Sequence, residues 1–178
     1  MPRGFLNRRS FVAAAVLGVV AAVLVGVGAA ATSINPSNAP NGTHYKSGTA
    51  SCSASGTTVT CSGYTLAGVG NADATASLSA TYSATVVCIN GGSNPSDSQH
   101  QGSFSKPVSS GQLEPKNGNL TVPSLTATAP TASQFLAQQT CPNPNWTPTL
   151  GSAITLSSYT YTLTFVGFSG PYITITGP

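Results

Sequence analysis

Few side chains in this sequence could exchange a proton with a substrate. Beyond residue 31 the acidic residues are Asp73, Asp97 and Glu114, and the only histidines are His44 and His100. Carboxylates that share acid–base chemistry must lie within several ångströms of each other, and no pattern in the sequence brings two of them together. We therefore expect no catalytic residue, and a hydrolase ranks third among the functions considered.

A metal site has equally little support. Asp97 and His100, in the run DSQH, could supply two ligands. Zinc needs three or four ligands that the fold holds in place, whereas both histidines lie in segments rich in turn residues. We expect solvated loop histidines, no metal and no cofactor.

One short motif matches a known nucleophile pattern. Ser103 and Lys106, in the run SFSK, have the Ser-x-x-Lys spacing of serine lactamases. That chemistry needs the lysine one helical turn beyond the serine. The alternation of the surrounding residues predicts a strand instead, which turns the two side chains to opposite faces.

The four cysteines predict two disulfides. Cys52 and Cys61 flank the run SASGTTVT, in which Gly56-Thr57 suits a two-residue type II′ turn. Counting outward from that turn places Cys52 opposite Cys61 in a non-hydrogen-bonded pair, where Cα atoms lie about 4.5 Å apart and accept a disulfide. Cys88 and Cys141 remain and form the second bridge. Structural disulfides are typical of exported proteins.

Residues 1–31 have the features of an export signal. Arg8 and Arg9 precede an uncharged apolar run over residues 11–27, and three alanines at residues 29–31 suit a signal peptidase. The run NRRSFV resembles a twin-arginine signal, but the apolar run fits the general secretory route equally well. Because of the cleavage site, we favour a removed signal peptide over a retained membrane anchor.

The charge of the remaining chain excludes one class of partner. The formal net charge of +3 comes from the signal segment, and Lys46, Lys106 and Lys116 then balance the three acidic residues. Binding to nucleic acid needs clustered cations, so we exclude it. We expect an unidentified envelope or extracellular partner, and contact with a membrane only through a retained N-terminal segment.

Most of the chain is predicted to form strands. Residues 74–88, ATASLSATYSATVVC, alternate small apolar with hydroxyl side chains, and residues 120–128, 154–166 and 172–176 alternate similarly. Only residues 133–139 have a helical pattern. Strands with one polar face predict an all-β, two-sheet antiparallel sandwich, immunoglobulin-like or similar, over residues 48–178. Residues 32–47, which lack an apolar period, should form a flexible lead-in.

A second hairpin is predicted at Asn117-Gly118, a strong two-residue turn signal. Counting outward places Pro115 opposite Leu120 and Leu113 opposite Val122. Pro115 would then mark the edge of a sheet, because its missing N–H costs nothing there.

Three runs together, CSGYTLAGVGN at residues 61–71, CINGG at 88–92 and CPNPNW at 141–146, resemble a recurrent set in uncharacterised exported bacterial proteins. The resemblance implies an exported all-β domain. It implies no activity, and so it assigns no functional residue.

The aromatic residues leave two alternatives for function. Trp146, beside a cysteine and two prolines, is expected to fill the core. The alternative is that Trp146 and Tyr82 form a platform for a small ligand or carbohydrate at one end of the sandwich. The sequence therefore favours a non-catalytic, exported structural or interaction module of the cell envelope or secreted fraction, with a ligand carrier as the second hypothesis.

Overall fold

The computed structural model describes residues 30–90 and 95–178, and for residues 95–97 the backbone alone. All but the last two residues of the expected export signal, including Arg8 and Arg9, lie outside these ranges. Within them, none of the helices combines the length and the apolarity that crossing a membrane requires.

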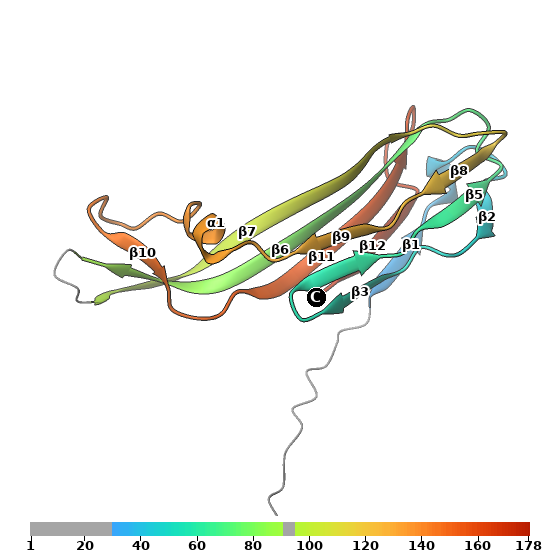
Figure 1. The fold of residues 1–178 in the computed structure, drawn as a ribbon. Coiled ribbons are helices and arrows are strands. Elements are labelled where there is room, and N and C mark those ends of the chain that lie inside the picture. The colour runs from blue at the N-terminus through green and yellow to red at the C-terminus, as the bar shows by residue number, and fades with distance from the viewer. Residues whose placement is uncertain (1–29, 91–94) are drawn as a thin grey trace, which may run out of the picture.

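A six-stranded antiparallel sheet, sheet A, forms the first layer (Figure 1). Its strands, in the order in which they pair, are β1 (Ala31–Ile34), β12 (Ile173–Gly177), β11 (Thr155–Phe165), β6 (Ala74–Ile89) and β7 (Pro95–Leu113). The sixth strand, β10 (Thr147–Leu150), pairs with the far end of β6, beyond the end of β11.

The second layer consists of three strands that are each broken once. One half contains β2 (His44–Ser47), β5 (Tyr64–Ala67) and β8 (Asn119–Val122), and the other contains β3 (Cys52–Ser55), β4 (Thr58–Cys61) and β9 (Leu125–Thr128). Short links join β2 to β3, β4 to β5 and β8 to β9, so the two halves lie end to end. At the break the backbones approach closely: a Cβ on Gly63 would lie 3.1 Å from the Val122 carbonyl oxygen.

The core lies between the two layers. Every even-numbered residue of β6 from Ala74 to Cys88 is buried, as the alternation predicts. The inward faces of both layers supply the other large core side chains, namely Val59, Tyr64, Leu66, Leu120, Val122, Tyr159, Tyr161, Leu163, Phe165, Ile173 and Ile175. Removing this apolar area from water is the main driving force for folding. The structure confirms the all-β, two-layer sandwich.

Sheet A extends beyond the second layer as an arm, formed by the distal halves of β6 and β7 together with β10 and α1 (Ala132–Leu136) (Figure 1). The arm has its own small core of Ala84, Val86 and Phe135, and the ring of Phe104 stacks on Phe135 with 6.4 Å between centroids. A capping box at Thr131 starts α1, since its Oγ1 accepts a hydrogen bond from the Gln134 N–H at 3.2 Å. This short helix confirms the helical pattern at residues 133–139.

Both disulfides are present in the predicted pairing. Cys52 and Cys61 lie opposite each other with Cα atoms 4.0 Å apart, in the register counted from the Gly56 turn. Cys88 and Cys141 are joined with Cα atoms 5.8 Å apart, and this bridge ties the segment after α1 to the arm.

The prediction of a flexible lead-in over residues 32–47 is wrong. Most of β1, the short 3-10 helix η1 (Pro36–Asn38) and all of β2 lie there. The Asn35 N–H donates to the Tyr172 carbonyl at 2.8 Å. Backbone hydrogen bonds to neighbouring strands order this segment, and such bonds need no apolar period in the sequence.

The predicted second hairpin is correct at its turn and wrong beyond it. Asn117 and Gly118 have φ angles of 51° and 72°, as a type I′ turn requires. Pairing stops after Lys116 and Asn119, because β8 pairs instead with β5 and Leu113 pairs with Ala74 in sheet A. Pro115 lies where the chain crosses between the layers, so it does not mark the edge of a strand.

Candidate interaction surface

The outer face of sheet A is covered by short hydroxyl side chains. Paired residues of adjacent strands point to the same side, so the side chains that alternate with the core form rows across the sheet. One row runs through Thr174, Thr162, Ser77 and Ser109. We call this surface the hydroxyl face, and it comprises Ser33, Thr75, Ser77, Ser79, Thr81, Ser83, Ser103, Ser105, Ser109, Thr160, Thr162, Thr164, Thr174 and Thr176.

The hydroxyl face is regular and uncharged. Strand geometry places neighbouring rows roughly 7 Å apart along each strand and neighbouring side chains about 4.8 Å apart across strands. A few hydroxyls bond locally, as Ser157 does to Ser83 at 2.6 Å. Most of the array therefore offers donors and acceptors to a partner at fixed spacing.

The outer face of the second layer differs. It also carries hydroxyls, and Thr60 and Thr126 lie 3.3 Å apart there. The breaks in its three strands interrupt the rows, however, and Lys46 adds a charge, with its Nζ donating to the Asn119 Oδ1 at 3.1 Å. Of the two layers that the described residues form, sheet A is the one with a continuous uncharged array.

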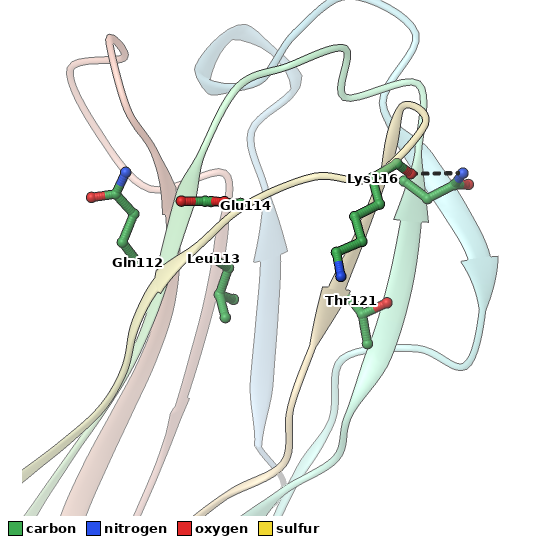
Figure 2. A pocket seen from close by; sticks show the side chains of 6 residues that line it. Gln112, Leu113, Glu114, Lys116 and Thr121 are labelled. Atoms are coloured by element: carbon green, nitrogen blue, oxygen red, sulfur yellow. Dashed lines mark hydrogen bonds between the residues drawn. The ribbon is translucent and has the colours of Figure 1, made fainter.

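A polar hollow of about 470 Å³ lies where the chain crosses from β7 to β8 (Figure 2). Glu114 and Lys116 line it, and the neighbouring Gln112 donates from its Nε2 to the Asp73 carboxylate at 2.6 Å. The remaining lining residues are Leu113, Asn119 and Thr121. Lys46, which bonds Asn119, lies nearby. Four charged side chains of the described ranges therefore gather at this end of the sandwich, namely Lys46, Asp73, Glu114 and Lys116.

The structure separates the two residues proposed as a ligand platform. Tyr82 is completely buried, and burial raises the pKa of its phenol. Trp146 lies next to Thr147, which pairs with Ile89, seven positions along β6 from Tyr82. That separation is about 23 Å along a strand, so the two rings share no site.

Trp146 does not fill the core either, so that expectation is wrong. It is half-buried and belongs to neither apolar cluster, and its backbone N–H donates to the Asn143 carbonyl at 3.0 Å. The bridge from Cys141 to Cys88 holds its segment at the arm, away from the core between the two layers.

The histidines lie in strands and not in loops, contrary to expectation. His44 begins β2, is exposed, and has its Nδ1 2.8 Å from the Gly42 carbonyl oxygen. His100 lies in β7 opposite Val86. In residues 30–90 and 98–178 no three histidine, cysteine or acidic side chains come close enough to hold a metal ion.

The Ser-x-x-Lys residues lie on a strand, as predicted. Ser103 belongs to the hydroxyl face, whereas Lys106 pairs with Ala80 and therefore lies on the opposite face of β7. The arrangement that serine-lactamase chemistry needs is not formed by these two residues.

The molecule is thus a disulfide-linked, two-layer all-β domain, an architecture typical of extracellular proteins. No protein-family model, no curated protein and no solved structure matches the chain. Its surface is therefore the basis on which a function can be assigned.

Proposed function

We propose that this protein is a non-catalytic structural or interaction module that acts after export, in the cell envelope or secreted fraction, and binds envelope polysaccharide through the hydroxyl face. The observation that carries the proposal is the continuity of that face across β12, β11, β6 and β7, whose register is unbroken on both sides of β6 from Ser77 to Thr81.

The chemistry of the face favours a polymer over a small ligand. A hydroxyl both donates and accepts, and a single such bond contributes only about 1 kcal/mol net. Useful affinity therefore needs many bonds made at once to a partner with its own repeating hydroxyls. Serine and threonine also lose less side-chain entropy on contact than lysine or arginine would.

Co-sedimentation with insoluble peptidoglycan sacculi, and with cellulose as a second glycan, tests the proposal. Thr162→Lys places a long charged side chain in the middle of the hydroxyl face and should abolish most binding. Thr126→Lys makes the same change on the outer face of the second layer and should bind like the wild type. No binding to either glycan, or equal loss in both variants, would reject the proposal.

The polar hollow supports a second candidate, a carrier of a small polar ligand. Its charges, Glu114 and Lys116, are matched to a zwitterionic or hydrogen-bonding solute rather than to an apolar one. If this candidate is correct, Glu114→Ala and Lys116→Ala remove binding of soluble glycan fragments, while Thr162→Lys leaves it intact.

A further inference from the structure

β7 is an open edge of sheet A. It pairs with β6 and with no other strand of the described ranges, and it forms the upper border of the sheet in Figure 1. Its outward side chains from residue 101 to residue 109, at every second position, are all exposed. A strand edge of this kind offers backbone N–H and C=O groups to another strand.

The register identifies which backbone groups point outward. In β6 the odd-numbered residues bond toward β10 and β11: the Thr85 carbonyl accepts from the Gly151 N–H at 2.8 Å, and the Ser83 carbonyl accepts from the Thr155 Oγ1 at 3.2 Å. Antiparallel pairs alternate in type, so the residues opposite these in β7 direct their N–H and C=O away from β6. They are Gln101, Ser103, Ser105, Pro107 and Ser109.

Two of these outward positions are irregular. Pro107 has no N–H, so the edge lacks one donor there. The Ser103 carbonyl already accepts a hydrogen bond from the Gln139 Nε2 at 3.0 Å. This carbonyl therefore needs no donor from a strand that pairs with the edge. The two irregularities lie two residues on either side of Ser105.

We propose that two copies of the chain associate by antiparallel pairing of their β7 edges, with Ser105 opposite Ser105 of the partner subunit. In this register Ser103 faces Pro107 of the partner subunit. A residue with an N–H at position 107 would donate it to the carbonyl of the partner subunit's Ser103. Proline has no N–H, but that carbonyl already accepts a hydrogen bond from Gln139. Of the outward carbonyls at residues 101, 103, 105 and 109, it is at Ser103 that the described part of the chain supplies a second donor, so this register matches Pro107 to a satisfied carbonyl.

The side chains are compatible with this pairing. On the outer face Ser105 meets its counterpart, Ser103 meets Pro107 of the partner subunit and Gln101 meets Ser109 of the partner subunit. All of these side chains are uncharged, and the pairing continues the hydroxyl face from one copy into the next. On the inner face Phe104 lies opposite Lys106 of the partner subunit, so no like charges are directly opposed. A hollow of about 460 Å³ beside the edge, lined in part by Phe104 and Ala137, gives these longer side chains room.

The role of the dimer rests on the proposed function, because pairing of the two β7 edges would double the width of the hydroxyl face that binds polysaccharide. Sedimentation velocity over a concentration series, on protein recovered from an exporting host, tests it. Ser105→Pro removes both central hydrogen bonds but no backbone bond to β6, and it should yield monomer. It also removes the contact of the Ser105 hydroxyl with Thr81 at 3.4 Å. Ser105→Thr keeps a hydroxyl at this position and should dimerise like the wild type.

Gln139 provides the sharper test. Gln139→Ala leaves the Ser103 carbonyl bare in the dimer and should weaken association at least tenfold. Adding Pro107→Ser to Gln139→Ala supplies a backbone donor at the facing position and should restore most of the affinity. If Gln139 and Pro107 instead only shield the edge, Gln139→Ala strengthens association and the double variant strengthens it further.

Monomer at all concentrations, or stronger association of Gln139→Ala, would overturn the dimer. The two proposals fail separately: a monomer that still binds sacculi overturns the dimer alone, and a dimer that binds neither glycan overturns the proposed function alone. Near-ultraviolet circular dichroism of each variant confirms that the fold is retained.

Discussion

The phenol oxygens of Tyr64 and Tyr161 lie 2.9 Å apart in the middle of the core, and their hydrogen bond joins the two layers. Tyr64 is 4% exposed and Tyr161 is 1% exposed. Each hydroxyl satisfies the other, so the core holds two polar atoms without leaving either unpaired. The ring of Tyr45 packs edge-on against Tyr64, with 5.5 Å between centroids.

Breaking this pair from one side should destabilise the protein more than removing it. Tyr64→Phe or Tyr161→Phe alone leaves one buried hydroxyl without a partner and should lower the free energy of unfolding by about 1–3 kcal/mol. The double variant leaves no unpaired hydroxyl and should cost less than either single variant, as measured by chemical denaturation. Strict additivity would show that the two hydroxyls do not depend on each other.

The same pair predicts a loss of stability at alkaline pH. Burial, and then the neighbouring Tyr161, raise the pKa of Tyr64 above its ordinary value of 10.0. Below pH 10 both the folded and the unfolded states keep the proton, so stability does not change. Above it only the unfolded state loses the proton, and the free energy of unfolding should fall by up to about 1.4 kcal/mol per pH unit for each such tyrosine.

Titration of unfolding between pH 8 and pH 12 measures this slope. The double variant, Tyr64→Phe with Tyr161→Phe, should have a shallower slope. Some slope should remain, because burial also raises the pKa values of Tyr82, Tyr159 and Tyr172. Stability that rises above pH 10 would contradict this reading of the core.

The two disulfides should act on different parts of the molecule. Replacing Cys88 and Cys141 by alanine opens a bridge across 53 residues, which on the chain-entropy model costs about 4 kcal/mol. Because that bridge holds the arm, fluorescence of the single tryptophan, Trp146, should shift to longer wavelength. Replacing Cys52 and Cys61 should cost about 2.5 kcal/mol and leave the tryptophan emission unchanged.

The arm should unfold before the sandwich. Phe135 is fully buried, but among the described residues its core cluster contains just two other buried side chains, Ala84 and Val86. Phe135→Ala should therefore increase hydrogen exchange in α1 and β10, with little change in β11 and β12. Phe165→Ala in the main core is the matched control and should raise exchange throughout the domain. Equal effects of the two variants would mean that the arm has no separate stability.

The sequence predicted those features that depend on local chemistry. Alternation located β6 and β11, and the Gly56 turn fixed the register that pairs Cys52 with Cys61. Where the partner of a strand is distant, local rules failed. The Asn117 turn formed as predicted, but β8 pairs with the distant strand β5 instead of continuing the hairpin. Backbone hydrogen bonds to β12 and β5 order β1 and β2, which have no apolar pattern.

The sequence predicted the polar side chains of the hydroxyl face but not their arrangement in rows. The alternating hydroxyls of residues 75–85 and 160–164 predicted polar faces on single strands. Their assembly into rows depends on the register between strands that are far apart in the sequence, as the pairing of Ser77 with Thr162 and of Ser33 with Thr174 shows. The contact between Ser103 and Gln139 could not be predicted either, because it joins two segments that are 36 residues apart.

The most direct test of the hydroxyl face is the accessibility of single cysteines in the presence of the polymer. Ser79→Cys places a thiol in the middle of that face, and Thr126→Cys places one on the outer face of the second layer. With sacculi or cellulose bound, maleimide labelling of the first should slow at least tenfold while labelling of the second stays at its free rate. Equal rates at the two positions, or protection at residue 126 alone, would contradict binding through sheet A.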